Sequence, residues 1–264
     1  MPAPALWCLR LSVAGQCIAA ARTARVAGSE VNSWLFMKAG LPESVASFTD
    51  QVAAGLLFMV AVSAIVRPIR GLLFFNAAWM AALAFAIFTN PGTTVDALAP
   101  FSHAVRVAAP LGLALLPLDA GEELRHSARK STFALWILLL GVAATFIAHG
   151  IEALQHYGRF VDLIIGSAKQ WLGLGVTQQT AEQLLTVIGV QDILFAPLLL
   201  SRRWRWVAGW MAFWGLSTAL SRVTAMGDGS WHQSLIRIAN GGVPLALYLG
   251  WWHLVRPSIA PQKP

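Results

Sequence analysis

Residues 133–152 read FALWILLLGVAATFIAHGIE, a stretch with no Asp, Glu, Lys or Arg before Glu152. The hydrocarbon core of a bilayer is about 30 Å thick, and about 20 apolar residues of helix cross it. The stretch therefore predicts a transmembrane helix. Five further strong candidates are 52–66, 72–89, 184–200, 206–223 and 235–255. Two weaker candidates are 6–21, which carries Arg10, and 103–118, which opens with His103 and Arg106.

The composition of the 264-residue chain argues against an ordinary soluble domain. Hydrophobic residues make up 57% of it and charged residues only 12%, whereas soluble domains carry about 25% charged residues. So few polar groups cannot cover a water-facing surface, and we therefore expect the lipid bilayer to be the main partner. The twelve tryptophans agree, because indole rings favour the membrane–water interface. The sequence predicts an all-α, polytopic integral membrane protein.

The basic residues predict the number of crossings and their orientation. The formal net charge is +7, and the basic residues form short runs between apolar segments, as the positive-inside rule describes. We therefore expect no nucleic-acid partner. With eight crossings, all the basic runs fall on the same side of the membrane as both termini, and this side is predicted to be cytoplasmic. Omitting one weak segment would scatter the basic runs over both faces. The residues concerned are Arg67, Arg70, Arg125, Arg129, Lys130, Arg202, Arg203, Arg205, Arg256 and Lys263.

The two halves of the chain resemble each other in the order of their features. Residues 40–70 can be laid on 175–205 without a gap, which matches the arginine pair of one half with that of the other. The pattern predicts two parallel four-helix repeats, related by an axis along the membrane normal. The predicted division is 1–118 for the first repeat, 119–131 for a cytoplasmic linker, 132–256 for the second repeat and 257–264 for a short polar tail.

A polar stretch separates the first two helices of each half, at 26–51 and at 153–183. In the second of these, residues 159–172 alternate apolar and polar side chains at helical spacing. This pattern is typical of a helix that lies in the membrane interface, here opposite the Arg-rich loops. Helix starts are predicted at Pro42-Glu43 and at a capping box, Thr180–Gln183.

Asp192 lies near the middle of the segment 184–200. Ionisable groups inside membrane segments are costly, and each is a candidate functional residue. Asp192 is predicted either to be a ligand-binding or proton-relay carboxyl or to form a structural hydrogen bond or ion pair with a neighbouring helix, for instance with Arg222.

His149, Glu152 and His156 follow one another at helical spacing, which predicts one stripe at the non-cytoplasmic end of their helix. Imidazole and carboxylate groups can bind a transition metal, and His149 could also contact a quinone or haem. The spacing is not a recognised metal signature, so no metal site is predicted. The alternative is an ordinary polar helix end that faces water.

Arg106 and Arg237 hold matching positions in the two predicted repeats, on the same side as the histidine stripe. Together they could hold an anionic head group, or each could extend to lipid phosphates. Asn240 opens the run Asn-Gly-Gly-Val-Pro, which should weaken its helix and so point to a pocket. No catalytic residue is identified. The tentative ligand-binding set is Arg106, His149, Glu152, Asp192, Arg237 and Asn240.

Each half resembles the four-helix DoxX-like membrane proteins. The resemblance rests on Leu9-Arg10-Leu11 with Gly15, on the polar excursion that follows, and on a second helix that ends in basic residues, as in 188–205. It implies a bacterial inner-membrane location and a link to quinone or sulfur redox chemistry, since some DoxX-like proteins are subunits of thiosulfate:quinone oxidoreductase. The duplication departs from the usual single unit, and no catalytic residue can be transferred.

Three functional hypotheses follow, and the sequence does not decide whether the chain is an enzyme. The first is a redox-linked subunit that binds quinone as a cofactor, or a small anion, and works with a membrane-protein partner. The second is a non-catalytic scaffold or assembly partner. The third is a small-solute transporter with Asp192 as its coupling carboxyl.

Overall fold

The computed structural model describes residues 1–116, 124–202 and 204–255, and over these ranges the chain is helical with no strand. The predicted tail 257–264, residues 119–123 of the predicted linker, Arg203, Arg256 and Lys263 lie outside the described residues. The all-α prediction is confirmed for the part of the chain that is described.

Each of the eight predicted segments overlaps one of the longer helices. These helices are α1 (Ala3–Val26), α3 (Glu43–Val66), α4 (Arg70–Thr89), α6 (Ala104–Leu115), α7 (Leu124–Leu154), α9 (Gln178–Leu200), α10 (Arg205–Met226) and α12 (Ala239–Val255). Six stretches among the described residues are long and apolar enough to cross a membrane: Ala3–Val26, Glu43–Val66, Arg70–Thr89, Thr94–Leu115, Ser131–Leu154 and Gln178–Leu200. Both weaker candidates are among them, whereas α10 and α12 are not.

Shorter elements lie between the long helices. They are α2 (Glu30–Met37), the 3-10 turn η1 (Thr94–Leu98), α5 (Ala99–Ser102), α8 (Gly158–Leu172), the 3-10 turn η2 (Asp228–Ser230) and α11 (Trp231–Leu235). The predicted helix at 159–172 is therefore confirmed as α8. Residues 124–131 of the predicted linker are helical, because α7 begins at Leu124.

Helix starts show how local chemistry sets the boundaries. Pro42 precedes the first turn of α3, as predicted. The predicted capping box at Thr180 is wrong, because α9 begins at Gln178. There the Thr177 side chain accepts a hydrogen bond from the Thr180 backbone N–H at 3.2 Å, which satisfies one of the free N–H groups of the first turn.

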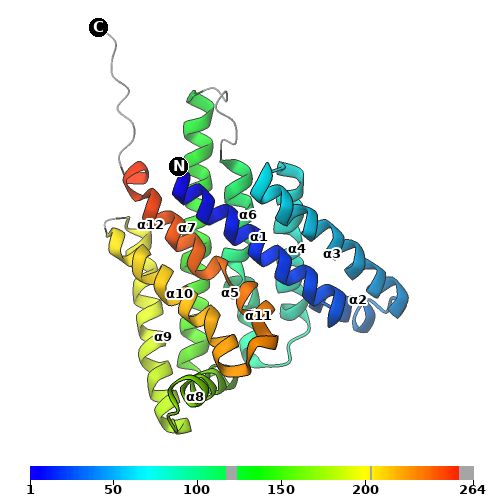
Figure 1. Ribbon diagram of the computed structural model, residues 1–264, viewed down its shortest axis with the longest axis vertical. Coiled ribbons are helices and arrows are strands. Elements are labelled where there is room, and N and C mark those ends of the chain that lie inside the picture. The colour runs from blue at the N-terminus through cyan, green and yellow to red at the C-terminus, as the bar shows by residue number, and fades with distance from the viewer. Residues whose placement is uncertain (117–123, 203, 256–264) are drawn as a thin grey trace.

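The long helices pack in a recurring order (Figure 1). Helix α1 packs on α3 as α7 packs on α9, and α4 packs on α6 as α10 packs on α12. The helices of the first half, α1 to α6, contact those of the second half, α7 to α12, mainly through α6 with α7 and through α1 with α12. The short elements follow the same order, since α5 contacts α7 and α11 contacts α1.

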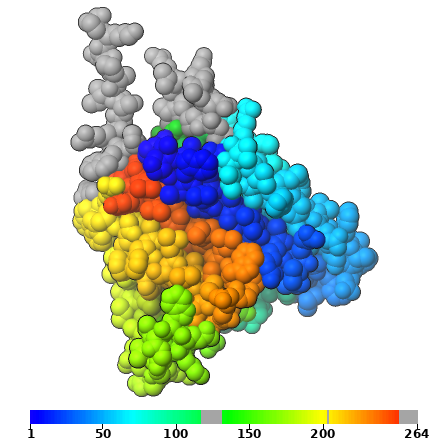
Figure 2. All heavy atoms as spheres, in the orientation of Figure 1, coloured from blue at the N-terminus to red at the C-terminus, as the bar shows by residue number. Residues whose placement is uncertain are grey.

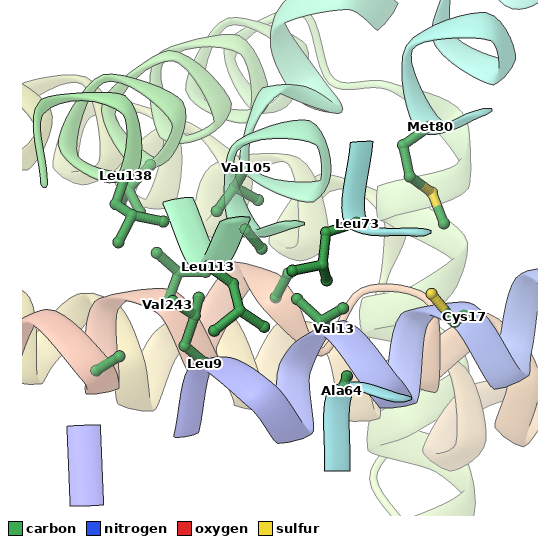
Figure 3. Close-up of a cluster of buried hydrophobic side chains, with 14 of the residues drawn as sticks. Leu9, Val13, Cys17, Ala64, Leu73, Met80, Val105, Leu113, Leu138 and Val243 are labelled. Carbon is green, nitrogen blue, oxygen red and sulfur yellow. The ribbon is translucent and has the colours of Figure 1, made fainter. Parts of the chain in front are cut away.

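The centre of the molecule is a core of aliphatic side chains. In Figure 3, Leu9 of α1 lies against Leu113 of α6 and Val243 of α12, and Val13 of α1 lies near Leu73 of α4. All five side chains are fully buried. Close packing of this kind holds the helices of the two halves of the chain together.

The outer surface of the helices is apolar as well. On α9 the side chains of Leu184, Val187, Val190 and Leu194 are each at least 45% exposed and recur at helical spacing. Figure 2 shows the face formed by α1, α10 and α12, with α8 at one end. Soluble monomers rarely expose apolar surface of such extent, so this surface is suited to contact with lipid.

Candidate functional site

Two cavities lie at the end of the molecule where α2, α8 and α11 are found, which we call the α8 end. In Figure 1 it is the end away from the start of α1 and the last turn of α12. The first, the polar cavity, has a volume of about 390 Å³. Its wall includes Glu30, His103, Arg106, Glu152, Arg222 and Arg237.

Three arginines that line the polar cavity come from three different segments. Arg106 is in the first turn of α6, Arg222 is near the end of α10, and Arg237 lies in the turn between α11 and α12. Arg106 is 5% exposed and Arg222 is 9% exposed. Among the described residues none of the three forms a salt bridge with a carboxylate. Burying a charge without a paired ion is costly.

The three guanidinium groups differ in their hydrogen bonds. Arg222 donates to the backbone carbonyl of Thr218, and Arg237 donates to that of Gln233 at 2.7 Å. The guanidinium group of Arg106 makes no hydrogen bond with any described residue, and its Nε is buried without a partner. Arg106 therefore has donors free for a ligand.

Two of the carboxylates that line the polar cavity already have partners within the protein. Glu152 is buried, and its Oε2 lies 2.9 Å from Nδ1 of His149. The Asp96 carboxylate accepts hydrogen bonds from the backbone N–H groups of residues 92 and 93, both at 2.7 Å. With Glu30, the cavity wall carries three acidic side chains. Arg159 also lines the cavity, so the wall carries four arginines. The polar cavity is therefore electropositive.

The second cavity, the apolar chamber, has a volume of about 210 Å³. Its apolar wall is formed by Phe146, Phe160, Leu163, Ile164, Leu185 and Ile188. It adjoins the polar cavity, because His149, Phe160, Arg222 and Arg237 line both.

One corner of the apolar chamber carries polar atoms without partners. These are Oδ1 of Asp192, Nε1 of Trp214 and Oδ1 of Asn240, all three buried, and the Asp192 carboxyl also lies close to the side chains of Trp214 and Gln191. Asp192 is 5% exposed and forms no salt bridge with Arg222, so the predicted pair between them is absent. Asp50 shows the opposite case. It is buried, but its carboxylate accepts from the backbone N–H and the hydroxyl of Ser29, at 2.7 and 2.5 Å.

All six side chains of the tentative ligand-binding set line these cavities. Arg106 and Glu152 line the polar cavity, Asp192 and Asn240 line the apolar chamber, and His149 and Arg237 line both. The first residues of α12 are helical, so the break in the predicted segment 235–255 lies before Asn240, between α11 and α12.

Two details of the predicted arrangement are wrong. His156 does not continue the stripe of His149 and Glu152, because α7 ends at Leu154. His156 has a positive φ of 51° and lies 2.9 Å from the Thr186 hydroxyl. Arg106 and Arg237 do not hold matching positions, since Arg106 is inside α6 whereas Arg237 precedes α12. The burial of Arg106 also argues against its extension to lipid phosphates.

The tentative set omitted Arg222, His103 and His232, all of which line the polar cavity. The signal that could have included Arg222 is its place in an apolar segment, the same signal that selected Asp192. Within the described residues no group of three or more His, Cys, Asp or Glu side chains could hold a metal ion.

Comparison of the chain with protein-family models, curated proteins and solved structures found no match. The chemistry of the site is therefore the basis for a functional proposal. The site combines a basic cavity, rich in hydrogen-bond donors, with an adjoining chamber of apolar walls. Such convergence of a few polar groups on an apolar pocket is typical of a ligand-binding site.

Proposed function

We propose that this chain is a polytopic inner-membrane protein that crosses the bilayer eight times as two parallel four-helix repeats. The exposed apolar side chains of α9 support a lipid environment. The recurring order of packing supports the repeats, as does the place of Pro110 in α6 and Pro244 in α12, each within the first two turns of its helix. In this proposal the Arg-rich loops and both termini are cytoplasmic, and the α8 end faces outward.

We further propose that the polar cavity binds a small anion. The observation that carries this proposal is that Arg106, Arg222 and Arg237 face one cavity without a salt bridge to any described carboxylate. A guanidinium group presents its N–H donors in a fork that matches carboxylate or phosphate oxygens. An anion would use these donors and also balance the buried positive charge.

The quinone hypothesis draws on the same donors, because quinone carbonyl oxygens accept hydrogen bonds. A neutral quinone would leave the positive charge of the arginines unbalanced, which is why we favour the anion. The relationship to the DoxX-like proteins, the role as a redox-linked subunit and the membrane-protein partner stay predictions.

A transporter is a second candidate, and one observation favours it. Asp192 is buried beside the apolar chamber with one carboxylate oxygen unpartnered, as expected for a coupling carboxyl inside a membrane segment. Solute flux into proteoliposomes that is the same for the wild-type protein and for Asp192→Asn would argue against this candidate.

Anion binding can be tested by titrating inorganic phosphate into the purified protein in lipid nanodiscs and measuring the heat of binding. A hydrogen bond to a charged group contributes about 1.5–3 kcal/mol. We therefore expect Arg106→Gln to weaken phosphate binding about tenfold or more, since about 1.4 kcal/mol corresponds to tenfold. Arg25→Gln is the matched control, because Arg25 is exposed near the end of α1 and does not line the cavity.

Two outcomes would contradict the anion proposal. One is that phosphate and sulfate both fail to bind the wild-type protein, and the other is that Arg106→Gln and Arg25→Gln bind phosphate equally well. If a short-chain, water-soluble quinone binds where the anions do not, the quinone hypothesis replaces the anion proposal.

A further inference from the structure

We infer that the polar cavity and the apolar chamber form one site for an amphiphilic anion. In this arrangement an anionic group contacts Arg222 and Arg237, and an apolar body attached to it occupies the chamber. The inference rests on the proposed function, because the anionic group uses the polar cavity. It adds the class of ligand: a single molecule with a charged head, a short apolar body and a hydroxyl at the far end.

The shared wall of the two cavities supports this inference. Arg222 and Arg237 line both cavities, so an anion bound to them lies at the boundary between the cavities. His149 and Phe160 also belong to both walls, and their ring centroids are 5.9 Å apart. A substituent on the bound anion can therefore extend directly into the chamber.

The size of the apolar chamber limits the body of the ligand. Its volume is about 210 Å³, and an apolar cavity of about 150 Å³ is sufficient for a benzene molecule. The body is therefore a single ring or a chain of about eight carbons. A phospholipid with two long chains would exceed this volume.

Helix α8 forms one side of the chamber and is held firmly in place. Phe160, Leu163 and Ile164 of α8 line the chamber. Further along α8, the Ser167 hydroxyl lies 2.7 Å from the Thr224 hydroxyl of α10. The Gln170 side chain donates to the Ala225 carbonyl of α10 at 2.8 Å. These contacts fix α8 against α10, so the chamber is a formed cavity that a rigid ring or short chain can fill.

The polar corner of the chamber specifies the far end of the ligand. Asp192, Trp214 and Asn240 each place a buried, unpartnered polar atom there. A pure hydrocarbon body would leave these atoms unsatisfied, which costs free energy. A hydroxyl group at the far end could accept a hydrogen bond from Trp214 Nε1 and donate one to an oxygen of Asp192 or Asn240.

The test compares inorganic phosphate, octyl phosphate, 8-hydroxyoctyl phosphate and 1-octanol, each titrated into protein-loaded nanodiscs with empty nanodiscs as the blank. We expect octyl phosphate to bind at least tenfold more tightly than inorganic phosphate, and 1-octanol to bind more weakly than octyl phosphate. We also expect 8-hydroxyoctyl phosphate to bind more tightly than octyl phosphate. Trp214→Phe, which keeps the ring and removes the donor, should reverse that last preference.

A pair of neighbouring leucines supplies matched variants. Leu185 is buried and lines the chamber, whereas Leu184 is 45% exposed and does not. We expect Leu185→Trp to reduce the affinity for octyl phosphate to that for inorganic phosphate, and Leu184→Trp to leave it unchanged. Ser217→Leu, at another lining position, provides the same block if Leu185→Trp does not fold.

The outcomes separate this inference from the anion proposal. If inorganic phosphate binds and octyl phosphate binds no more tightly, the inference is wrong and the anion proposal stands. If octyl phosphate binds more tightly but equally well to Leu185→Trp and Ser217→Leu, its chain lies in the lipid and the inference is again wrong. If no phosphate compound binds, both proposals fail.

Discussion

At the scale of single residues, glycines decide how closely the helices approach. A Cβ atom on Gly215 would collide with the backbone of Asn240, so α10 and α12 are in backbone contact there. Gly150 and Gly189 play the same part between α7 and α9, because a Cβ on either would lie within 3 Å of the other's carbonyl oxygen. Small residues at helix crossings are the usual means of close packing in membranes.

This contact predicts opposite effects for two Gly→Ala substitutions. Gly215→Ala should lower the free energy of unfolding by about 1–3 kcal/mol, the usual cost of overpacking. Gly55→Ala should leave stability unchanged or raise it by up to about 1 kcal/mol, because Gly55 lies in α3 with open space around its Cβ position. Thermal unfolding of both variants in detergent provides the measurement. An equal loss in both would contradict the contact.

Sequence patterns could not distinguish these glycines, since each lies in an apolar helix. They also could not show why Arg10 is tolerated in α1. In the structure Arg10 donates to the carbonyls of Ala64, Ile65 and Val66 at the end of α3, and its guanidinium lies 4.5 Å from the Trp7 ring centroid. It satisfies carbonyls that every helix leaves free at its end.

At the scale of elements, a buried carboxylate of α3 links that helix to the start of α2. Ser29 caps α2 by accepting from the Asn32 backbone N–H at 3.1 Å, and Ser29 is in turn held by Asp50 of α3. Helix α2 has no buried residue of its own. This link, together with the contact of Trp34 with Phe85 of α4, holds α2 beside the polar cavity, which Glu30 lines.

We expect Asp50→Ala to loosen α2 while leaving the long helices folded. Each lost hydrogen bond to the carboxylate removes about 1.5–3 kcal/mol of local stability, and α2 has no buried residue of its own to compensate. Hydrogen–deuterium exchange of residues 30–37 should become faster, with the remaining helices unchanged. Thr49→Val, at the neighbouring half-buried position, is the control and should exchange like the wild-type protein. Unchanged exchange in Asp50→Ala would show that the link is dispensable.

At the scale of the whole molecule, the proposed orientation is the property most open to direct test. We expect a membrane-impermeant maleimide added to intact cells to label Gly175→Cys, in the loop between α8 and α9. Gly71→Cys, at the start of α4 beside the Arg-rich loop, should be labelled only after the membrane is opened. Open space surrounds the Cβ position of both glycines.

The labelling test requires a background without the native cysteines, in which Cys8→Ala and Cys17→Ala replace the two free thiols of α1. Labelling of both reporter positions in intact cells, or of Gly71→Cys alone, would contradict the proposed orientation. The positive-inside rule is the physical basis of the expectation, because the loops beside Arg67, Arg70 and Arg202 are rich in basic residues.

The sequence by itself determined the helical class, the approximate extents of the long helices and the residues worth testing. Hydropathy and charge are local properties, so a run such as 133–152 predicts its helix without any knowledge of its neighbours. Asp192 and Arg106 were found in the same way, because an ionisable group in an apolar segment is conspicuous wherever the segment packs.

Only the tertiary structure decided what those residues face. Asp50 and Asp192 are both buried acids in long helices. Ser29 donates hydrogen bonds to the Asp50 carboxylate, whereas no described residue forms a salt bridge with Asp192. The polar cavity and the apolar chamber exist because α6, α7, α8, α9, α10 and the turn before α12 converge at one end. That convergence depends on contacts between segments distant along the chain, and no local pattern encodes it.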